Sequence, residues 1–154
     1  MRRPCRRCRT AEGTLSKPDY ETHFLAGVRH FNGREFWEAH EAWETIWLVA
    51  ESDVEQFLQG LIQLAAAYHH VKRGTFRGAV RLFDAALQRL SAFPPVWSGL
   101  DRTGAEEAAR RHREWVAARI AGGKGAAERL SESEFPALIL LGREASPLPP
   151  HEQW

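Results

Sequence analysis

The chain has 154 residues, which is enough for one domain with a substantial core. Hydrophobic residues make up 44% and charged residues 27%, as in ordinary globular proteins. No run reaches the roughly 18 apolar residues of a membrane span, so we expect no membrane insertion and a cytoplasmic protein.

The positive charge is concentrated at the start of the chain. Five arginines lie within residues 1–9, and setting them aside changes the net charge from +1 to −4. The body is therefore no general polyanion binder, and any nucleic-acid contact would come through this arm. No apolar stretch follows the arginines, so we expect no secretory signal. Residues 1–17 are predicted to form a basic, disordered arm.

The two cysteines, Cys5 and Cys8, lie in this arm with C-x-x-C spacing. A structural zinc site needs four ligands, and the sequence offers no second C-x-x-C or H-x-x-x-H. A thioredoxin-like role would need a strand-helix-strand unit, which the pattern lacks. A metal site shared between chains, and with it a homo-oligomer, stays open as an alternative.

The first three predicted helices cover residues 18–73. Pro18 marks the start of a helix to about residue 31, Asn32-Gly33 makes a turn, and a second helix covers 34–49. The order Ser52-Asp53-Val54-Glu55 is typical of a capping box and predicts a third helix from there to Arg73. Gly74 is expected to end it.

Two further helices complete the domain. One covers 75–92 and must end at Phe93-Pro94-Pro95. Thr103-Gly104-Ala105-Glu106 resembles a second capping box, which predicts a helix to about residue 121. Residues 122–154 form a Gly/Pro-rich extension in which 135–140 should pack on the helices. The predicted fold is therefore all-α, a compact bundle of about five helices over residues 18–121.

An internal repeat appears at an offset of 40 residues. It aligns Gly27, His30, Ala39 and Trp43 with the set Ala67, His70, Ala79 and Phe83. Small residues that let helices approach, followed by aromatics that fill the groove, resemble the tetratricopeptide pattern. The sequence thus predicts two tetratricopeptide-like helical hairpins and a capping helix.

The second predicted helix concentrates aromatic and ionisable side chains. Helical spacing places Trp37, His40, Glu44 and Trp47 on one face. Glu38, Glu41 and Glu44 are neighbours at spacings of three. The next helix carries a polar stripe of Gln59, Gln63 and His70, with His69 beside it, which an antiparallel pairing could bring to His40. Trp37, Trp43 and Trp47 would form the aromatic walls.

Several interpretations of these residues stay open. A buried network of His40, Glu44 and a glutamine would satisfy its own hydrogen bonds and fix helix register. Alternatively, His40, Glu41, Glu44 and His70 (or His69) could bind a divalent metal ion, because imidazoles and carboxylates on facing helices build such sites. The order His-Glu-x-x-Glu is not that of a zinc protease. The pattern is also consistent with an acid–base role for Glu41 or Glu44 with His40, and with a peptide-binding groove.

A set of motifs resembles one known family. The motifs are F-N-x-G-x-F-x-E-x-H-E-x-x-E-x-x-W from Phe31 to Trp47, Q-G-L-I-Q-x-A-A from Gln59, a histidine before Arg73-Gly74, and then Gly78-Ala79. Over roughly residues 22–100 the chain is similar to the bacterial and archaeal domain-of-unknown-function family number three hundred and nine. The resemblance implies a compact all-α domain with no established reaction. The basic arm, Thr75 and the long tail depart from the family pattern.

From these observations we expect a non-catalytic interaction or small-ligand-binding module with a His/Glu polar network. The alternative is a metal-dependent hydrolase that uses His40, Glu41, Glu44 and a histidine of the third helix. The sequence establishes no cofactor, and a divalent metal is the one it leaves open. It does not identify a protein or small-molecule partner.

Overall fold

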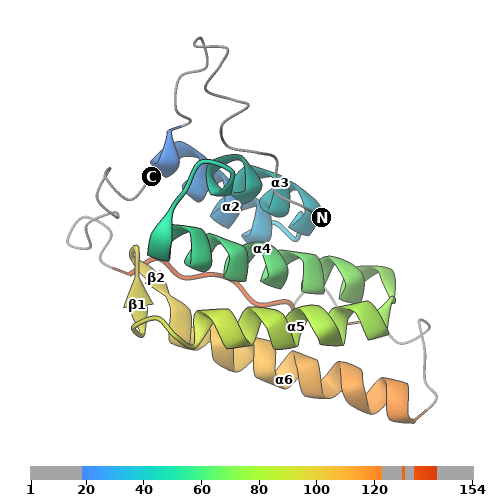
Figure 1. The fold of residues 1–154 in the computed structure, drawn as a ribbon. Coiled ribbons are helices and arrows are strands. Elements are labelled where there is room, and N and C mark those ends of the chain that lie inside the picture. Colours follow the sequence, from blue (N-terminus) through green and yellow to red (C-terminus); the bar gives the residue numbers. More distant parts are fainter. Residues whose placement is uncertain (1–18, 123–129, 131–133, 142–154) are drawn as a thin grey trace.

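A computed structural model describes residues 19–122, 130 and 134–141. Its helices are α2 (Tyr20–Asn32), α3 (Phe36–Trp47), α4 (Ser52–Arg73), α5 (Phe76–Leu90) and α6 (Arg102–Ala121). Each helix packs against the next, and α4, α5 and α6 lie side by side (Figure 1). The predicted helical bundle is confirmed for the described residues. The arm over 1–17 and much of the 122–154 extension lie outside them.

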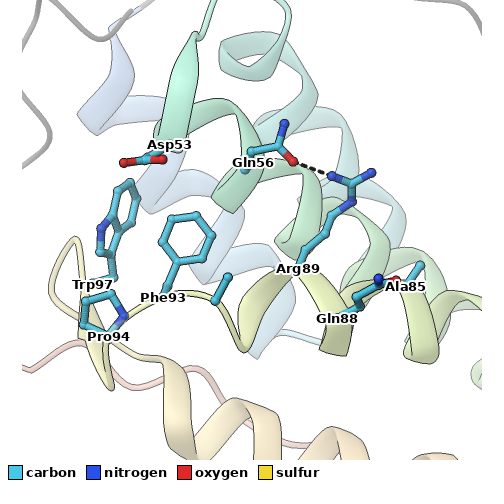
Figure 2. A pocket seen from close by; sticks show the side chains of 9 residues that line it. Asp53, Gln56, Ala85, Gln88, Arg89, Phe93, Pro94 and Trp97 are labelled. Atoms are coloured by element: carbon cyan, nitrogen blue, oxygen red, sulfur yellow. Dashed lines mark hydrogen bonds between the residues drawn. The ribbon is translucent and has the colours of Figure 1, made fainter.

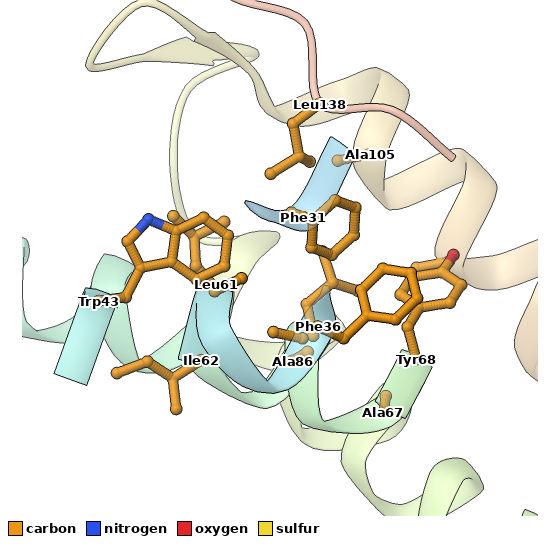
Figure 3. Packing of buried hydrophobic residues seen from close by; sticks show 14 of the residues in the cluster. Phe31, Phe36, Trp43, Leu61, Ile62, Ala67, Tyr68, Ala86, Ala105 and Leu138 are labelled. Atoms are coloured by element: carbon orange, nitrogen blue, oxygen red, sulfur yellow. The ribbon is translucent and has the colours of Figure 1, made fainter. Parts of the chain in front are cut away.

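The core is a continuous cluster of apolar side chains around α4, with aromatic rings at its centre (Figure 3). The ring of Tyr68 on α4 lies 5.6 Å from Phe31 and 5.5 Å from Phe36, measured between centroids. Trp43 of α3 is fully buried, and its indole N–H donates to the carbonyl of Phe24 on α2 at 3.1 Å. Trp43 is therefore a core residue and not a wall of an open site.

The predicted 40-residue repeat has a counterpart in two similar turns. Between α2 and α3, Arg34 has φ 65°, and the equivalent Gly74 between α4 and α5 has φ 79°. The following residues, Glu35 and Thr75, also match, with φ/ψ of −95°/69° and −91°/72°. The amide of each donates to the carbonyl five residues earlier at 2.9 Å. The turn that joins α2 to α3 thus has the same local structure as the turn that joins α4 to α5.

Both predicted capping boxes are wrong. Ser52 lies inside the first turn with φ 54°, and the N-cap is Glu51, whose side chain makes no capping hydrogen bond. At the start of α6 the N-cap is Asp101, whose carboxylate accepts from the amide of Gly104 at 3.1 Å. Glu106 instead binds the guanidinium groups of Arg102 and Arg110.

A small hairpin and a C-terminal strap, which we define as residues 134–141, pack against the helices. Strands β1 (Val96–Trp97) and β2 (Leu100–Asp101) pair antiparallel, and Leu100 bridges to Leu140 of the strap. The side chain of Asn32 binds the main chain of Leu138 in the strap. Its Nδ2 amide donates to the Leu138 carbonyl, and its Oδ1 atom accepts from the Leu138 N–H. The predicted packing of residues 135–140 on the helices is confirmed, and the hairpin was not predicted.

Within the described part of the chain, no helix combines the length and apolarity that crossing a membrane requires.

Candidate metal site and surface groove

His40, Glu41 and Glu44 form a cluster on the outer side of α3. The helix buries Phe36, Ala39, Trp43 and Ile46 toward the core, which turns the intervening polar positions away from it. One ligand atom from each of the three cluster residues lies within 4.8 Å of the others. The Nδ1 atom of His40 is 3.5 Å from Glu41 Oε1 and 3.7 Å from Glu44 Oε2.

The imidazole of His40 is held without being hydrogen-bonded. Its ring stacks on Trp37 with centroids 4.7 Å apart and an angle of 7° between planes. Only 18% of the His40 side chain is exposed, and its Nδ1 atom is buried with no hydrogen-bond partner. A buried nitrogen normally needs a partner, because its lost hydration costs about 1–3 kcal/mol. The Nδ1 atom of His40 faces the carboxylates of Glu41 and Glu44, and the three groups are close enough to bind one metal ion together.

The carboxylates differ in their access to solvent. Glu41 is 57% exposed and Glu44 is 29% exposed. The site is thus bounded by α3 and by the Trp37 ring on one side and open to solvent beside Glu41. Glu38 is exposed on the same helix but is not one of the three converging residues.

His69 lies next to this cluster without joining it. The Trp37 ring that stacks on His40 also contacts His69, with centroids 5.4 Å apart. Burial lowers the pKa of His69, the positive charge of Arg73 lowers it further, and the nearby Glu38 opposes both. His69 is consequently biased toward the neutral imidazole that can act as a metal ligand.

His70 has a different role. Its Nδ1 atom lies 2.6 Å from the Thr75 hydroxyl, and its ring packs over Gly78. Burial and then Arg73 lower its pKa. In the first copy of the repeat, His30 Nδ1 lies 3.1 Å from Glu35 Oε1 in the same way. Both histidines therefore stabilise turns, and the structure does not bring His70 to His40.

The predicted self-satisfied network does not form among the described residues. Gln63 Oε1 is buried with no hydrogen-bond partner, as is His40 Nδ1. Gln59 and Gln63 are both partly buried on α4, and no hydrogen bond joins either to the cluster in the described structure. Trp47 packs against the core. Of the predicted walls, Trp37 stacks on the imidazole of the cluster.

A groove of about 640 Å³ lies elsewhere on the surface, between the start of α4 and the end of α5 (Figure 2). Its apolar side is formed by Phe93, Pro94 and Trp97. Its polar groups come from Asp53, Gln56 and Arg89, and Arg89 Nη1 donates to Gln56 Oε1 at 2.5 Å. The sequence interpretation missed this groove because Phe93-Pro94-Pro95 signalled only a helix end.

Neither the curated proteins nor the solved structures compared with this chain give a match. A family model, described as Domain of unknown function (DUF309), matches residues 24–82. This range includes most of α2, all of α3 and α4, and the beginning of α5, and it contains the His40 cluster. It is shorter than the expected 22–100. Residues 24–82 of the chain are thus a DUF309 domain.

Proposed function

We propose that this helical domain is a non-catalytic ligand-binding module whose ligand is a divalent metal ion held by His40, Glu41 and Glu44. One observation carries the proposal. Three potential ligand atoms lie within 4.8 Å of one another, and the imidazole nitrogen among them is buried with no hydrogen-bond partner. A bound cation would give that nitrogen a partner and would offset the repulsion between the two carboxylates.

The donor set favours a first-row transition ion. Imidazole nitrogen with carboxylate oxygen suits Zn²⁺, Mn²⁺ or Fe²⁺, whereas Mg²⁺ and Ca²⁺ prefer sites made of oxygen atoms alone. Three protein ligands would leave at least one coordination position for water, and the exposure of Glu41 supports access of solvent to such a site.

Calorimetric titration with ZnCl2 tests the site. The full chain should carry Cys5→Ser and Cys8→Ser, so that the thiolates of the arm do not compete for zinc. We expect binding of one equivalent. His40→Ala and Glu44→Gln should each weaken it by at least about tenfold, since each removes a ligand.

Glu38→Gln provides the matched control, because it removes a carboxylate from the same helix outside the cluster. It should leave zinc affinity within about twofold of the parent, as expected for a screened surface charge. Absence of zinc binding, or equal losses for Glu38→Gln and Glu44→Gln, would contradict the proposed site.

A metal-dependent hydrolase is the second candidate, favoured by the solvent-facing side of the cluster at Glu41. A metal-bound water there could be activated as a nucleophile. Hydrolysis of a panel of activated esters and phosphoesters by the zinc-loaded protein, abolished by His40→Ala, would support it over simple binding.

The tetratricopeptide-like arrangement is also a proposal. It is supported by the matching turns at Arg34 and Gly74 and by the burial of Ala39, Trp43, Ala79 and Phe83 at equivalent positions. In such a stack, successive hairpins present a continuous surface to a protein partner.

A further inference from the structure

The groove between α4 and α5 has two chemically unlike ends. Phe93, Pro94 and Trp97 form one side, and Arg89 with Gln56 forms the other (Figure 2). Its volume of about 640 Å³ lies within the range of small-molecule and peptide sites. None of these residues belongs to the His40 cluster, so the groove is independent of the proposed metal site.

The Arg89 end is suited to a carboxylate. The guanidinium carries five N–H donors in a planar fork, and the bond from Nη1 to Gln56 Oε1 fixes its orientation. That bond uses one donor and leaves others for a bidentate contact. Gln56 accepts through its oxygen, so its amide N–H groups also remain available as donors next to the guanidinium.

The Trp97 end is suited to a cation. Trp97 is packed against Phe57 and Phe93, with centroids 4.4 Å and 5.1 Å away, so its indole is held in place. The carboxylate of Asp53 lines the same groove and is drawn on the Trp97 side of it (Figure 2). A cation that contacts an indole face gains from the ring quadrupole, and a neighbouring carboxylate adds direct charge attraction.

Asp53 and Gln56 place one polar group of each end on the same face of α4. Asp53 and Gln56 are three residues apart on α4, so their Cβ atoms lie about 5–6 Å apart. In an extended peptide, side chains at i and i+2 point to the same side and are about 6.8 Å apart. A basic residue and an acidic residue two positions apart would therefore suit Asp53 at one end and Gln56, the hydrogen-bond partner of Arg89, at the other.

We infer that the groove binds an extended peptide segment with a basic residue two positions from an acidic one. The basic side chain lies against Trp97 beside Asp53. The acidic side chain accepts from Arg89, and the peptide backbone crosses the groove between the two ends.

The test uses the full chain and the peptide Ac-Arg-Ala-Glu-NH2, followed through the indole N–H resonance of Trp97, which a Trp97→Phe sample assigns. We expect a saturable shift. Arg89→Gln should weaken binding by about tenfold, because it removes the charged partner of the carboxylate. Asp53→Asn should weaken binding for the corresponding reason at the other end.

Arg81→Gln is the matched control, since Arg81 is an exposed arginine of the same helix outside the groove. It should bind like the parent. With Ac-Arg-Ala-Gln-NH2, which lacks the carboxylate, the difference between the parent and Arg89→Gln should disappear. An unshifted Trp97 resonance, or equal losses for Arg89→Gln with both peptides, would overturn the inference.

Discussion

Gly27 shows how one residue sets the distance between two helices. A Cβ atom at this position would overlap the indole ring of Trp43. Because glycine leaves that space free, the indole reaches α2 and donates its hydrogen bond to the Phe24 carbonyl. The close approach of α2 and α3, and so the placement of the cluster on α3, depends on this missing side chain.

Gly27→Ala should therefore be strongly destabilising. The added methyl must displace a fully buried tryptophan and break its hydrogen bond, and we expect the free energy of unfolding to fall by about 3 kcal/mol. Chemical denaturation measures this change.

Gly33→Ala is the control for this substitution. Gly33 has an ordinary φ of −84°, and its nearest neighbour would be 3.4 Å from the new Cβ. This substitution should change the free energy of unfolding by less than about 0.5 kcal/mol. Similar effects at the two glycines would show that steric contact with Trp43 is not the cause.

At this scale the sequence identified the right residue types but not their partners. The helical spacing of His40 and Glu44 correctly placed them together. His70 followed an equally good pattern, yet it pairs with Thr75 in the turn. The repeat contained the missing signal, because His30 and Glu35 occupy the equivalent positions. A turn partner five residues away competes with one on a neighbouring helix at a smaller entropic cost.

At the scale of elements, helix starts depend on groups that precede the expected cap. The start of α6 is satisfied by Asp101, which is itself a residue of β2. The hairpin therefore fixes where the helix begins. Thr103 had the better sequence pattern, but its hydroxyl is buried in the structure with no hydrogen-bond partner.

Substitution of the two kinds of cap should give different results. Asp101→Ala removes the acceptor for the Gly104 amide and should lower the free energy of unfolding by about 1 kcal/mol. Ser52→Ala should change it by less than about 0.3 kcal/mol, because Ser52 caps nothing. Thermal denaturation of both variants decides the matter, and a larger loss for Ser52→Ala would restore the capping box as the helix start.

Helix ends were more predictable than helix starts. Gly74 ends α4 in the left-handed conformation, as its position after Arg73 predicted. Phe93-Pro94-Pro95 follows α5 as expected. Glycine and proline end helices through their own backbone conformation, so their positions in the sequence indicate directly where a helix ends. The hairpin was missed because two-residue strands are too short to show an alternating pattern. Its β2 strand is also paired with a distant residue, through the bridge from Leu100 to Leu140.

At the scale of the whole molecule, a partly buried pair, Tyr68 and His112, connects α4 and α6 and contacts the strap. The hydroxyl of Tyr68 lies 2.7 Å from His112 Nδ1, and Phe135 of the strap contacts the Tyr68 ring. Burial raises the pKa of Tyr68, so its hydroxyl stays protonated and can donate to the imidazole. Burial, and then the charge of Arg111, lower the pKa of His112, so that the neutral ring is favoured.

The pKa shift of His112 has a defined effect on stability. The folded-state pKa lies below the ordinary value of 6.5, so at pH values between the two the unfolded chain binds more protons. The stabilisation from the neutral ring is fully present above pH 6.5 and decreases as the pH falls through the folded-state pKa. His112→Asn should reduce the slope of unfolding free energy against pH in this range. Denaturation curves measured from about pH 7.5 to 5 would show this, and an unchanged slope would contradict it.

His69 and His70 also have lowered pKa values, so His112→Asn should retain part of the acid dependence.

The position of the strap was only partly predictable from sequence. Its apolar pattern showed that it packs on the bundle, but not that Phe135 contacts Phe36 of α3 or that Leu138 binds Asn32, which is 106 residues earlier. Periodicity reports local faces, and it does not show which distant segment covers them.

The two hydrogen bonds between Asn32 and Leu138 connect positions 106 residues apart. Closing so long a segment costs far more chain entropy than forming the helix pairs, whose turns span only a few residues. The helical pairs should accordingly assemble first, and the strap should dock onto a bundle that already exists. The same loop closure makes the strap the natural first region to detach when the native state opens locally, without requiring the helices to separate.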